Sequence, residues 1–414
     1  MSQTAENHDP YGALRFRDFR LLIAGRFPAQ IGEAMVSVAI GWELYERTGD
    51  AFALGLVGLV QIIPVMLLSL PGGYMADRYN RKRILLISQL VLIVCALLMT
   101  YLSVTDGALP LFYLTLGIIG AAKAFNNPAE DALTPQVVEP DAYQNAATWN
   151  SSVWQLSAIL GPAVSGMIIA ITGGAASVYA INALAGCILV GALLMIKSPQ
   201  RGQLSDKEPP LKALREGIRF LRGKPIILSA ITLDMFAVLF GGATFLLPIF
   251  ATDILGVGAT GLGLMRSAQS VGALLMALSI SRMPPFKQAG RTLLWAVAGF
   301  GVATIIFGLS TNFWLSMAML FALGALDNIS VVIRHTLIYS YTPDDMRGRV
   351  SSVSIVFIGA SNELGGFESG VAAALLGPVG AVVFGGFGTL AVVGAIAWKS
   401  PPLRNLRTIA TARV

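Results

Sequence analysis

Charged side chains lie within long apolar stretches of this chain, and their spacing is regular. Arg26 and Glu33 are seven residues apart, as are Asp327 and Arg334. Seven residues make about two turns of an α-helix, so each pair shares one helix face. A charge among apolar neighbours is costly to bury and tends to be paired or to bind a proton, an ion or a ligand. The other charges of this kind are Lys123, Asp234, Arg266, Glu363 and Glu368.

Glu33 is the first candidate for proton binding, because it lies in the middle of its predicted helix and a carboxylate there could take up a proton near neutral pH. Two pairings across a cavity are compatible with the sequence, Lys123 with Asp327 or Lys123 with Glu33. Either pair could be a permanent ion pair that only neutralises charge, or a proton or substrate site whose pairing changes between conformations. The amides of Gln61 and Gln269 are candidate substrate contacts.

The chain lacks the residue patterns of common catalytic and cofactor sites. Its two histidines, His8 and His335, are not placed to form a Ser-His-Asp set, and no His/Cys cluster has metal-ligand spacing. Cys95 and Cys187 both stand in apolar runs and indicate no disulfide framework. No Gly-x-x-x-x-Gly-Lys-Ser/Thr loop occurs, so ATP is not the direct energy source. We therefore expect neither an enzyme nor a resident cofactor or metal.

The elements that hold these charges are predicted to be membrane-spanning helices. Only 13% of the 414 residues are charged, whereas soluble domains average about 25%. A span takes about 20 apolar residues, and the uncharged runs predict an all-α polytopic membrane protein with twelve transmembrane helices. The run at 292–326 is divided by the polar Ser310-Thr311-Asn312 turn. The predicted spans are 21–45, 53–75, 84–105, 110–129, 144–171, 176–196, 226–252, 262–281, 292–310, 313–335, 349–375 and 380–398.

The lysines and arginines outside these spans are placed asymmetrically. With the N-terminus in the cytoplasm, nearly all of them fall in cytoplasmic loops and tails, and Arg47 alone lies on the opposite side. This bias predicts that both termini are cytoplasmic. It also accounts for the net charge of +6, so the basic balance indicates membrane topology and no nucleic-acid partner. Residues 1–20 do not resemble a cleavable signal, so the first apolar run is expected to remain as a span.

The two halves of the chain repeat each other at a nearly constant offset. The Leu-Gly-Leu run at 54–56 recurs at 262–264, an offset of 208, and Gly-Ala at 120–121 recurs at 324–325, an offset of 204. Such a repeat predicts two pseudo-symmetric six-helix bundles in the same orientation, as in one large class of transporters. The predicted parts are a cytoplasmic segment at 1–20, bundles at 21–197 and 225–398, a cytoplasmic linker at 198–224 and a cytoplasmic tail at 399–414.

Residues 72–83, GGYMADRYNRKR, resemble the loop 2–3 signature of the major facilitator superfamily, Gly-x-x-x-Asp-Arg-x-Gly-Arg-Arg. The resemblance implies a gate in which Asp77 accepts hydrogen bonds from the start of helix 11, with Arg78 and Arg81 bracing it. Asn80 replaces the usual glycine, and asparagine is the next-best residue for a left-handed turn. The second half has no equivalent motif, so the gate is expected to be single. The matching positions are Gly73, Asp77, Arg78, Arg81 and Lys82.

Residues 160–166, LGPAVSG, are similar to a helix-5 motif of exporters in this superfamily, with matches at Gly161, Pro162 and Gly166. Small residues allow close helix packing and proline bends a helix, so the alternative is a packed, kinked helix with no further role. The opening of the chain and TPDDMRGRVSSV in loop 10–11 resemble the drug/siderophore exporter branch, which includes the enterobactin exporter and macrolide efflux proteins. Lys123 is the only basic residue in helix 4, where drug antiporters carry an arginine.

The resemblance implies alternating access between two halves. In the family, helices 1, 4, 7 and 10 line the central cavity, helices 2, 5, 8 and 11 form the rocking surfaces, and helices 3, 6, 9 and 12 lie outside. The charges in the spans fit this arrangement, because the outer four helices have none. The expected residues of the proton and substrate cavity are Arg26, Glu33, Gln61, Lys123, Asp234, Gln269, Asp327, Arg334 and Glu363.

The function expected from these observations is proton-driven export of a small amphipathic compound, such as a drug or a siderophore, by a monomer in the bacterial inner membrane. The partners would be the small molecule, protons and the lipid bilayer, and the proton gradient would replace any cofactor. One alternative is an importer of a nutrient, or a lysolipid mover, on the same fold. Another, from a different class, is a membrane receptor or assembly factor that transports nothing.

Overall fold

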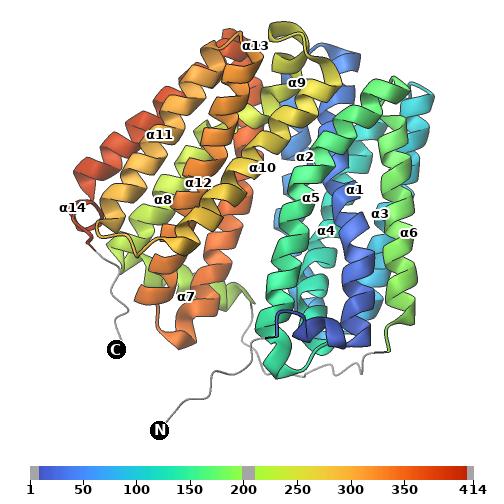
Figure 1. The fold of residues 1–414 in the computed structure, drawn as a ribbon, viewed down its shortest axis with the longest axis horizontal. Helices are drawn as coiled ribbons and strands as arrows, with labels where there is room; N and C mark the ends of the chain where they lie inside the picture. The colour runs from blue at the N-terminus through green and yellow to red at the C-terminus, as the bar shows by residue number, and fades with distance from the viewer. Residues whose placement is uncertain (1–8, 198–209, 408–414) are drawn as a thin grey trace.

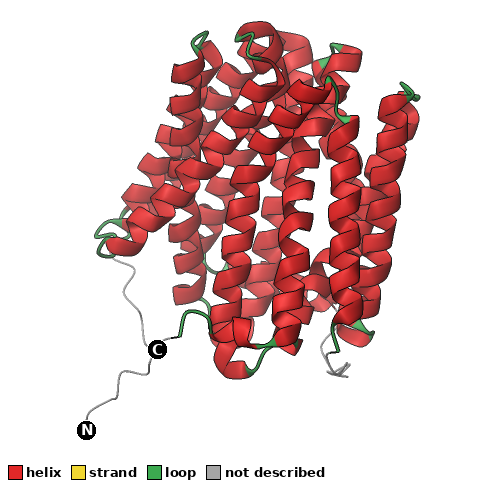
Figure 2. Ribbon diagram, turned by 45° about the vertical axis from the view of Figure 1, so that its right-hand side comes forward, coloured by secondary structure: helices red, strands yellow, loops and turns green. Residues whose placement is uncertain are grey.

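The computed structural model describes residues 9–197 and 210–407, which form helices and no β-strand (Figure 2). Ten of these helices are long and apolar enough to cross a membrane. Two further crossings complete the expected twelve. One is α1 (Arg17–Thr48), which is long enough but carries three charges in its interior. The other is in α13 (Asp344–Lys399), which counts once among the ten but is long enough for two crossings. The predicted all-α polytopic membrane fold is confirmed.

The first half of the chain supplies six long helices that alternate in direction (Figure 1). The Asp50 side chain accepts a hydrogen bond from Phe52 N at the start of α2, and Gly49 ends α1 in the left-handed conformation that glycine adopts without strain. The helices after α1 are α2 (Ala51–Arg78), α3 (Arg81–Val104), α4 (Leu109–Leu133), α5 (Tyr143–Thr172) and α6 (Ala176–Met195), with 3-10 turns η1 (Gly12–Arg15), η2 (Thr134–Gln136) and η3 (Pro140–Ala142).

The second half contains α7 (Pro210–Arg222), α8 (Pro225–Phe240), α10 (Gly258–Arg282), α11 (Ala289–Leu309), α12 (Phe313–Tyr341), α13 and the short α14 (Pro401–Arg404). The predicted break between α11 and α12 is confirmed, and Asn312 caps α12 by accepting a hydrogen bond from Leu315 N at 3.1 Å. The chain reverses within α13 at Gly377, whose φ of 74° is left-handed. Pro378 follows directly, so the backbone cannot continue the preceding helix there.

The seventh span differs from the single helix predicted at 226–252. After α8 ends at Phe240, the chain continues as the 3-10 turn η4 (Gly242–Leu246), the single turn α9 (Leu247–Ile249) and the π-helix η5 (Phe250–Ile254). Glycines at 241 and 242 weaken a helix interior, and Pro248 has no N–H to donate. The apolar composition predicted the span correctly, but these residues interrupt its regular hydrogen bonding.

The segment predicted as a linker contains the amphipathic helix α7, while residues 198–209 lie outside the described residues. Ile218 and Leu221 pack with apolar residues of α8, α12 and α13. Gly217 permits this close approach, because a Cβ there would lie 2.8 Å from the Arg349 carbonyl oxygen. Glu216 also pairs with Arg349 at 2.6 Å. The linker helix is therefore docked on the second half.

The two halves meet along two helix pairs, α2 with α13 and α5 with α10. These are spans 2 and 11 and spans 5 and 8, the pairs that the family resemblance assigns to the rocking surfaces. A Cβ on Gly55 would lie 3.0 Å from the Cα atom of Gly370. A Cβ on Gly166 would lie 2.3 Å from the Ala259 carbonyl oxygen. Both crossings therefore depend on residues without a side chain.

We call the end of the molecule where α1 begins and α6 ends the terminus side, which is the lower end in Figure 1, and the opposite end the far side. At the far side the Tyr45 hydroxyl of α1 donates a hydrogen bond to Asp253 of η5. A Cβ on Gly41 would lie 3.1 Å from Pro248 Cγ. The first and seventh spans thus close the seam between the halves at this end.

Candidate functional site

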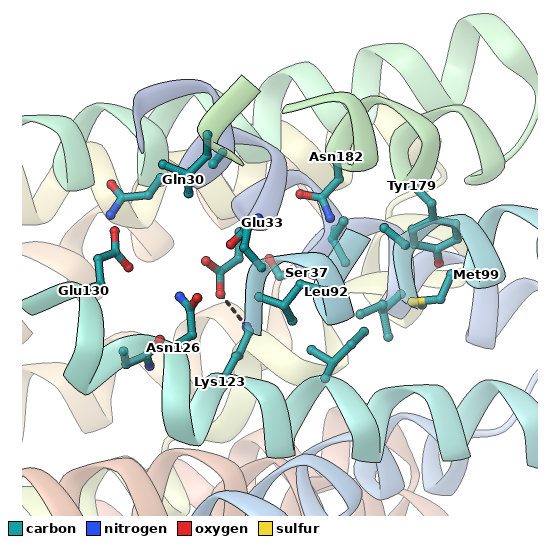
Figure 3. Close-up of a pocket in the computed structure, with 18 of the residues that line it drawn as sticks. Gln30, Glu33, Ser37, Leu92, Met99, Lys123, Asn126, Glu130, Tyr179 and Asn182 are labelled. Atoms are coloured by element: carbon teal, nitrogen blue, oxygen red, sulfur yellow. Dashed lines mark ion pairs between the residues drawn. The ribbon is translucent and has the colours of Figure 1, made fainter. Parts of the chain in front are cut away.

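A cavity inside the first bundle is lined by α1, α2, α3, α4 and α6 and has a volume of about 120 Å³. Figure 3 shows charged and amide side chains converging on it. The polar residues that line it are Arg26, Gln30, Glu33, Ser37, Gln61, Gln89, Lys123, Asn126, Asn127, Glu130, Tyr179 and Asn182.

Glu33 of α1 and Lys123 of α4 form an ion pair in this cavity, with 2.5 Å between Glu33 Oε1 and Lys123 Nζ (Figure 3). The side chains of Glu33 and Lys123 are 56% and 29% exposed, so a small molecule in the cavity can reach both. The sequence left two pairings open, and the structure contains this one; Lys123 is not paired with Asp327. Because α1 and α4 belong to the same bundle, the pair lies inside one half and does not bridge the two.

A second ion pair lies in the same cavity toward the terminus side. Arg26 Nε is 2.5 Å from Glu130 Oε1, and the side chains are only 11% and 14% exposed. Arg26 also donates a hydrogen bond to Asn150 Oδ1 of α5 at 3.1 Å. This pair ties α1, α4 and α5 together, and its burial favours a structural role over exchange with a ligand.

Amide side chains surround the Glu33–Lys123 pair. Gln30 Oε1 and Asn126 Oδ1 are buried and accept no hydrogen bond from any described residue. A buried acceptor of this kind normally meets water or a ligand. Gln61, predicted as a substrate contact, and Asn182 line the same space. The arrangement can therefore bind a molecule that carries both hydrogen-bond donors and a charged group.

The second bundle contains a buried ion pair between Asp234 of α8 and Arg334 of α12, whose side chains are 5% and 3% exposed. Ser330 donates a further hydrogen bond to Asp234 at 3.3 Å. Asp234 stands 208 positions after Arg26, and Arg334 stands 204 positions after Glu130. These are the offsets of the internal repeat, so the two buried pairs occupy equivalent places with their charges exchanged.

The remaining charges expected in the cavity do not line it. Asp327 lies beside Asp234 in a small space of the second bundle, and it forms no ion pair within 4 Å with any described residue. Glu363 of α13 packs against Gly58 of α2 across the seam and is attracted by both Lys123 and Arg266. Gln269 packs its backbone against Gly324.

The cavity described above lies within one half, and the expected cavity between the halves stays a prediction. All of the helices that line the described cavity, α1, α2, α3, α4 and α6, belong to the first bundle. In the second bundle the Asp234–Arg334 pair is buried, as is its equivalent Arg26–Glu130 in the first.

The predicted gate motif lies at the turn between α2 and α3, where its cations bind carbonyl groups at helix ends. Arg81 donates to the carbonyl oxygens of Ala76 and Ala132, each at 3.1 Å. Lys82 donates to the Ile196 carbonyl oxygen at 2.7 Å. These contacts clamp the turn onto the ends of α2, α4 and α6, where helix carbonyls lack internal partners.

Arg78 donates a hydrogen bond to the Tyr74 hydroxyl and lies over its ring, and the bracing of Asp77 stays a prediction. The conformation of Asn80 differs from expectation. Asn80 has a φ of −62° and not a left-handed conformation. Its side chain accepts a hydrogen bond from Arg83 N at 3.0 Å and caps α3. Asparagine is thus favoured here as a helix cap. Gly73 has open space where a Cβ would lie, so nothing in its packing requires glycine.

The helix-5 motif packs α5 against both of its neighbours. A Cβ on Gly161 would lie 2.5 Å from Ala34 Cβ of α1. On the other face, the Pro162 carbonyl oxygen would lie 2.3 Å from a Cβ on Gly263 of α10. The three matching residues therefore hold α5 between its own bundle and the opposite one, which gives the motif a packing role at the seam.

One polar cluster at the far side was not predicted from the sequence. Glu43 is buried and lies 2.5 Å from Arg47. Arg47 also donates to the carbonyl oxygens of Leu102 at 2.9 Å and Gly107 at 3.1 Å, and so secures the connection between α3 and α4. The i, i+4 spacing of Glu43 and Arg47 was the available signal. From the sequence alone, Arg47 could not be distinguished from an arginine in an exposed loop.

Comparison with known proteins gives one family and one fold. A family model described as transmembrane secretion effector matches residues 8–412. The enterobactin exporter EntS of Escherichia coli strain SMS-3-5 is 25% identical over 397 residues, which cover 91% of this chain and 90% of the relative. The EntS protein of Shigella boydii serotype 18 is similar to the same extent, with the same coverage of both chains.

Solved transporter structures share the fold at low sequence identity. The nucleoside transporter NupG has a TM-score of 0.71 at 13% identity and covers 92% of this chain and 98% of its own. A bacterial homologue of the iron transporter ferroportin, in an inward-facing state, has a TM-score of 0.70 at 17% identity, with coverages of 94% and 99%. At these identities the likeness shows the fold alone.

Proposed function

The chain belongs to the transmembrane secretion effector family, and from this premise we propose that it exports a small organic compound in exchange for protons. It is a multi-pass membrane transporter of the major facilitator type. The similar sequences are described as enterobactin exporters, which favours a siderophore or another small amphipathic compound as the substrate. The same relatives favour the bacterial inner membrane as its location.

The observation that carries the proposal is the half-exposed Glu33–Lys123 pair in a cavity lined by amide side chains. When Glu33 is deprotonated, its exposed carboxylate can bind a hydrogen-bond donor or a cationic group of the substrate. When Glu33 takes up a proton, the carboxylate loses its charge and the substrate loses this partner. Proton and substrate then compete for one site, as an exchanger requires.

The charges around Glu33 supply a connection to the other half. Arg26 and Glu130 act on Glu33 from within the first bundle. Lys123 is attracted by Glu33 and also by Glu363 of α13, which lies across the seam. Protonation of Glu33 shifts this balance toward Glu363. A ligand or proton that changes a contact at the seam changes the relative stability of the conformations that open the transporter to either side of the membrane.

Transport by the full-length protein in proteoliposomes, under an imposed pH gradient, tests the proposal. The probes are a radiolabelled catecholate siderophore and a fluorescent amphipathic dye. We expect Glu33→Gln to reduce gradient-driven transport to the level of protein-free vesicles, because the glutamine cannot exchange a proton. Glu46→Gln, on the exposed face of the same helix, is the matched control and should transport like the wild type.

Two outcomes would contradict the proposal. If Glu33→Gln transports as fast as the wild type under the same gradient, Glu33 is not the coupling group. If the probes move in the same direction as the protons, the protein is an importer and not an exchanger.

A further inference from the structure

A pocket on the terminus side of the second bundle has positively charged residues and no negatively charged one. It lies between the α10–α11 connection and the segment that follows α14, and it shares no residue with the cavity of the first bundle. Its lining residues are Lys287, Gln288, Arg291, Arg404, Asn405, Leu406 and Arg407.

The backbone of the C-terminal segment builds this pocket. Ala289 N donates a hydrogen bond to the Arg407 carbonyl oxygen at 3.4 Å, and Gly290 N donates to that of Leu406 at 3.2 Å. Leu403 is fully buried, and a Cβ on Gly290 would lie 1.7 Å from its carbonyl oxygen. The segment is therefore seated on the start of α11 and already uses the first amides of that helix. The positive character of the pocket comes from its four cationic side chains.

These four cations have no anionic partner in the described ranges, 9–197 and 210–407. None of them lies within 4 Å of a described carboxylate. Arg291 donates to Gln288 Oε1 and Arg404 to the Ala397 carbonyl oxygen, both at 3.3 Å and both to neutral groups. Like charges gathered in this way repel one another. A phosphate group among them would remove the repulsion and accept charge-assisted hydrogen bonds.

An apolar groove continues from the pocket along α11 and α12. Gln288 and Arg291 line both spaces, and the groove adds Thr292, Trp295, Ala296, Leu326 and Ile329. Trp295 is 76% exposed and stands one helical turn after Arg291. Tryptophan concentrates at the boundary between headgroups and hydrocarbon. A soluble anion would use only the pocket, whereas a phospholipid matches both the pocket and the groove.

We propose that this pocket and groove bind an anionic phospholipid. Its phosphate lies among Lys287, Arg291, Arg404 and Arg407, and one acyl chain lies along Trp295 between α11 and α12. The site needs neither the transport cavity nor proton coupling, so it stands or falls independently of the proposed function. Basic pockets next to a membrane helix are suited to such headgroups.

Native mass spectrometry of the full-length protein, titrated with phosphatidylglycerol or phosphatidylcholine in mixed micelles, measures the binding. Arg404→Gln with Arg407→Gln should weaken phosphatidylglycerol binding about 25-fold, at roughly fivefold for each cation removed. Binding of phosphatidylcholine should not change. Arg17→Gln with Arg20→Gln removes the same charge from exposed positions of the first bundle and should leave both affinities unchanged. Equal losses in the two double variants would overturn the proposal.

Quenching of tryptophan fluorescence by lipids brominated on the acyl chain tests the groove. Brominated phosphatidylglycerol should quench the wild type more than brominated phosphatidylcholine does. That excess should disappear in Trp295→Phe and persist in Trp314→Phe, which removes an equally exposed tryptophan near the far side. If the excess persists in Trp295→Phe, or if inorganic phosphate abolishes it, the site binds a soluble anion and the lipid proposal is wrong.

Discussion

At the scale of single residues, exposure separates the ion pairs that can exchange partners from those that hold helices together. Glu33 and Lys123 face open space, whereas Asp234 and Arg334 are almost completely buried. Removing one partner of a buried pair leaves an uncompensated charge, while removing both can be neutral. Removal of one charge is therefore expected to change transport at the Glu33–Lys123 pair and to lower stability at the Asp234–Arg334 pair.

Arg334→Leu should destabilise the second bundle by about 3–5 kcal/mol, because Asp234 then remains charged and unpaired in the interior. Thermal unfolding of the purified protein in detergent measures this change. The double variant Asp234→Leu with Arg334→Met should recover most of the lost stability. If the double variant is as unstable as Arg334→Leu, the pair contributes through packing and not through charge.

The positions of the charges could be predicted from the sequence, but most of their partners could not. Helical spacing placed Arg26 and Glu33 on one face, yet their partners Glu130 and Lys123 lie about 100 residues away on another helix. The repeat offsets did contain one further signal. Applied to Arg26 and Glu130, they lead to the other buried pair, Asp234 and Arg334.

At the scale of elements, composition predicted the spans well and backbone irregularities less well. The uncharged runs correctly separated α11 from α12 at the Ser310-Thr311-Asn312 turn. The interruption of the seventh span was not predicted, because its apolar residues are uniform and only Gly241, Gly242 and Pro248 indicate a break. The docking of α7 depends on contacts with α12 and α13, which are distant in sequence from the predicted linker.

Gly166→Ala tests the element that joins the halves at α5 and α10. The new methyl group would lie 2.3 Å from the Ala259 carbonyl oxygen, so we expect a loss of about 1–3 kcal/mol from overpacking. Thermal unfolding in detergent again provides the measurement. Gly191→Ala on α6, where a Cβ would meet no atom within 4 Å, should be neutral or slightly stabilising. A loss of equal size at Gly191 would contradict the close crossing.

At the scale of the whole molecule, the distribution of cations predicts a single orientation in the membrane. Lys82, Arg83 and Lys287 lie at the terminus side, and Arg47 binds carbonyl groups at the far side. By the positive-inside rule, we expect the terminus side to face the cytoplasm. An exporter in this orientation collects its substrate on the side where α7 and the basic pocket lie.

Labelling of single cysteines with a membrane-impermeant maleimide in intact cells tests this orientation. The background lacks Cys95 and Cys187, each replaced by alanine. Thr105→Cys, exposed at the far end of α3, should react in intact cells. Arg83→Cys, exposed at the other end of α3, should react only after the cells are opened. The reverse pattern would place the termini outside the cytoplasm.

The exchanged charges of the two buried pairs limit the routes by which the halves could have diverged from one ancestral repeat. In two identical halves, replacing the arginine at the position of Arg26 by an acid would bury two like charges, because the partner at the position of Glu130 is already acidic. Replacing the acid first would bury two cations. A route through an uncharged pair avoids two like charges, although its first step leaves one charge unpaired. Exchange of the two charges therefore requires coupled substitutions on two helices, and neither half can reverse its polarity by a single change without a buried charge that lacks a partner.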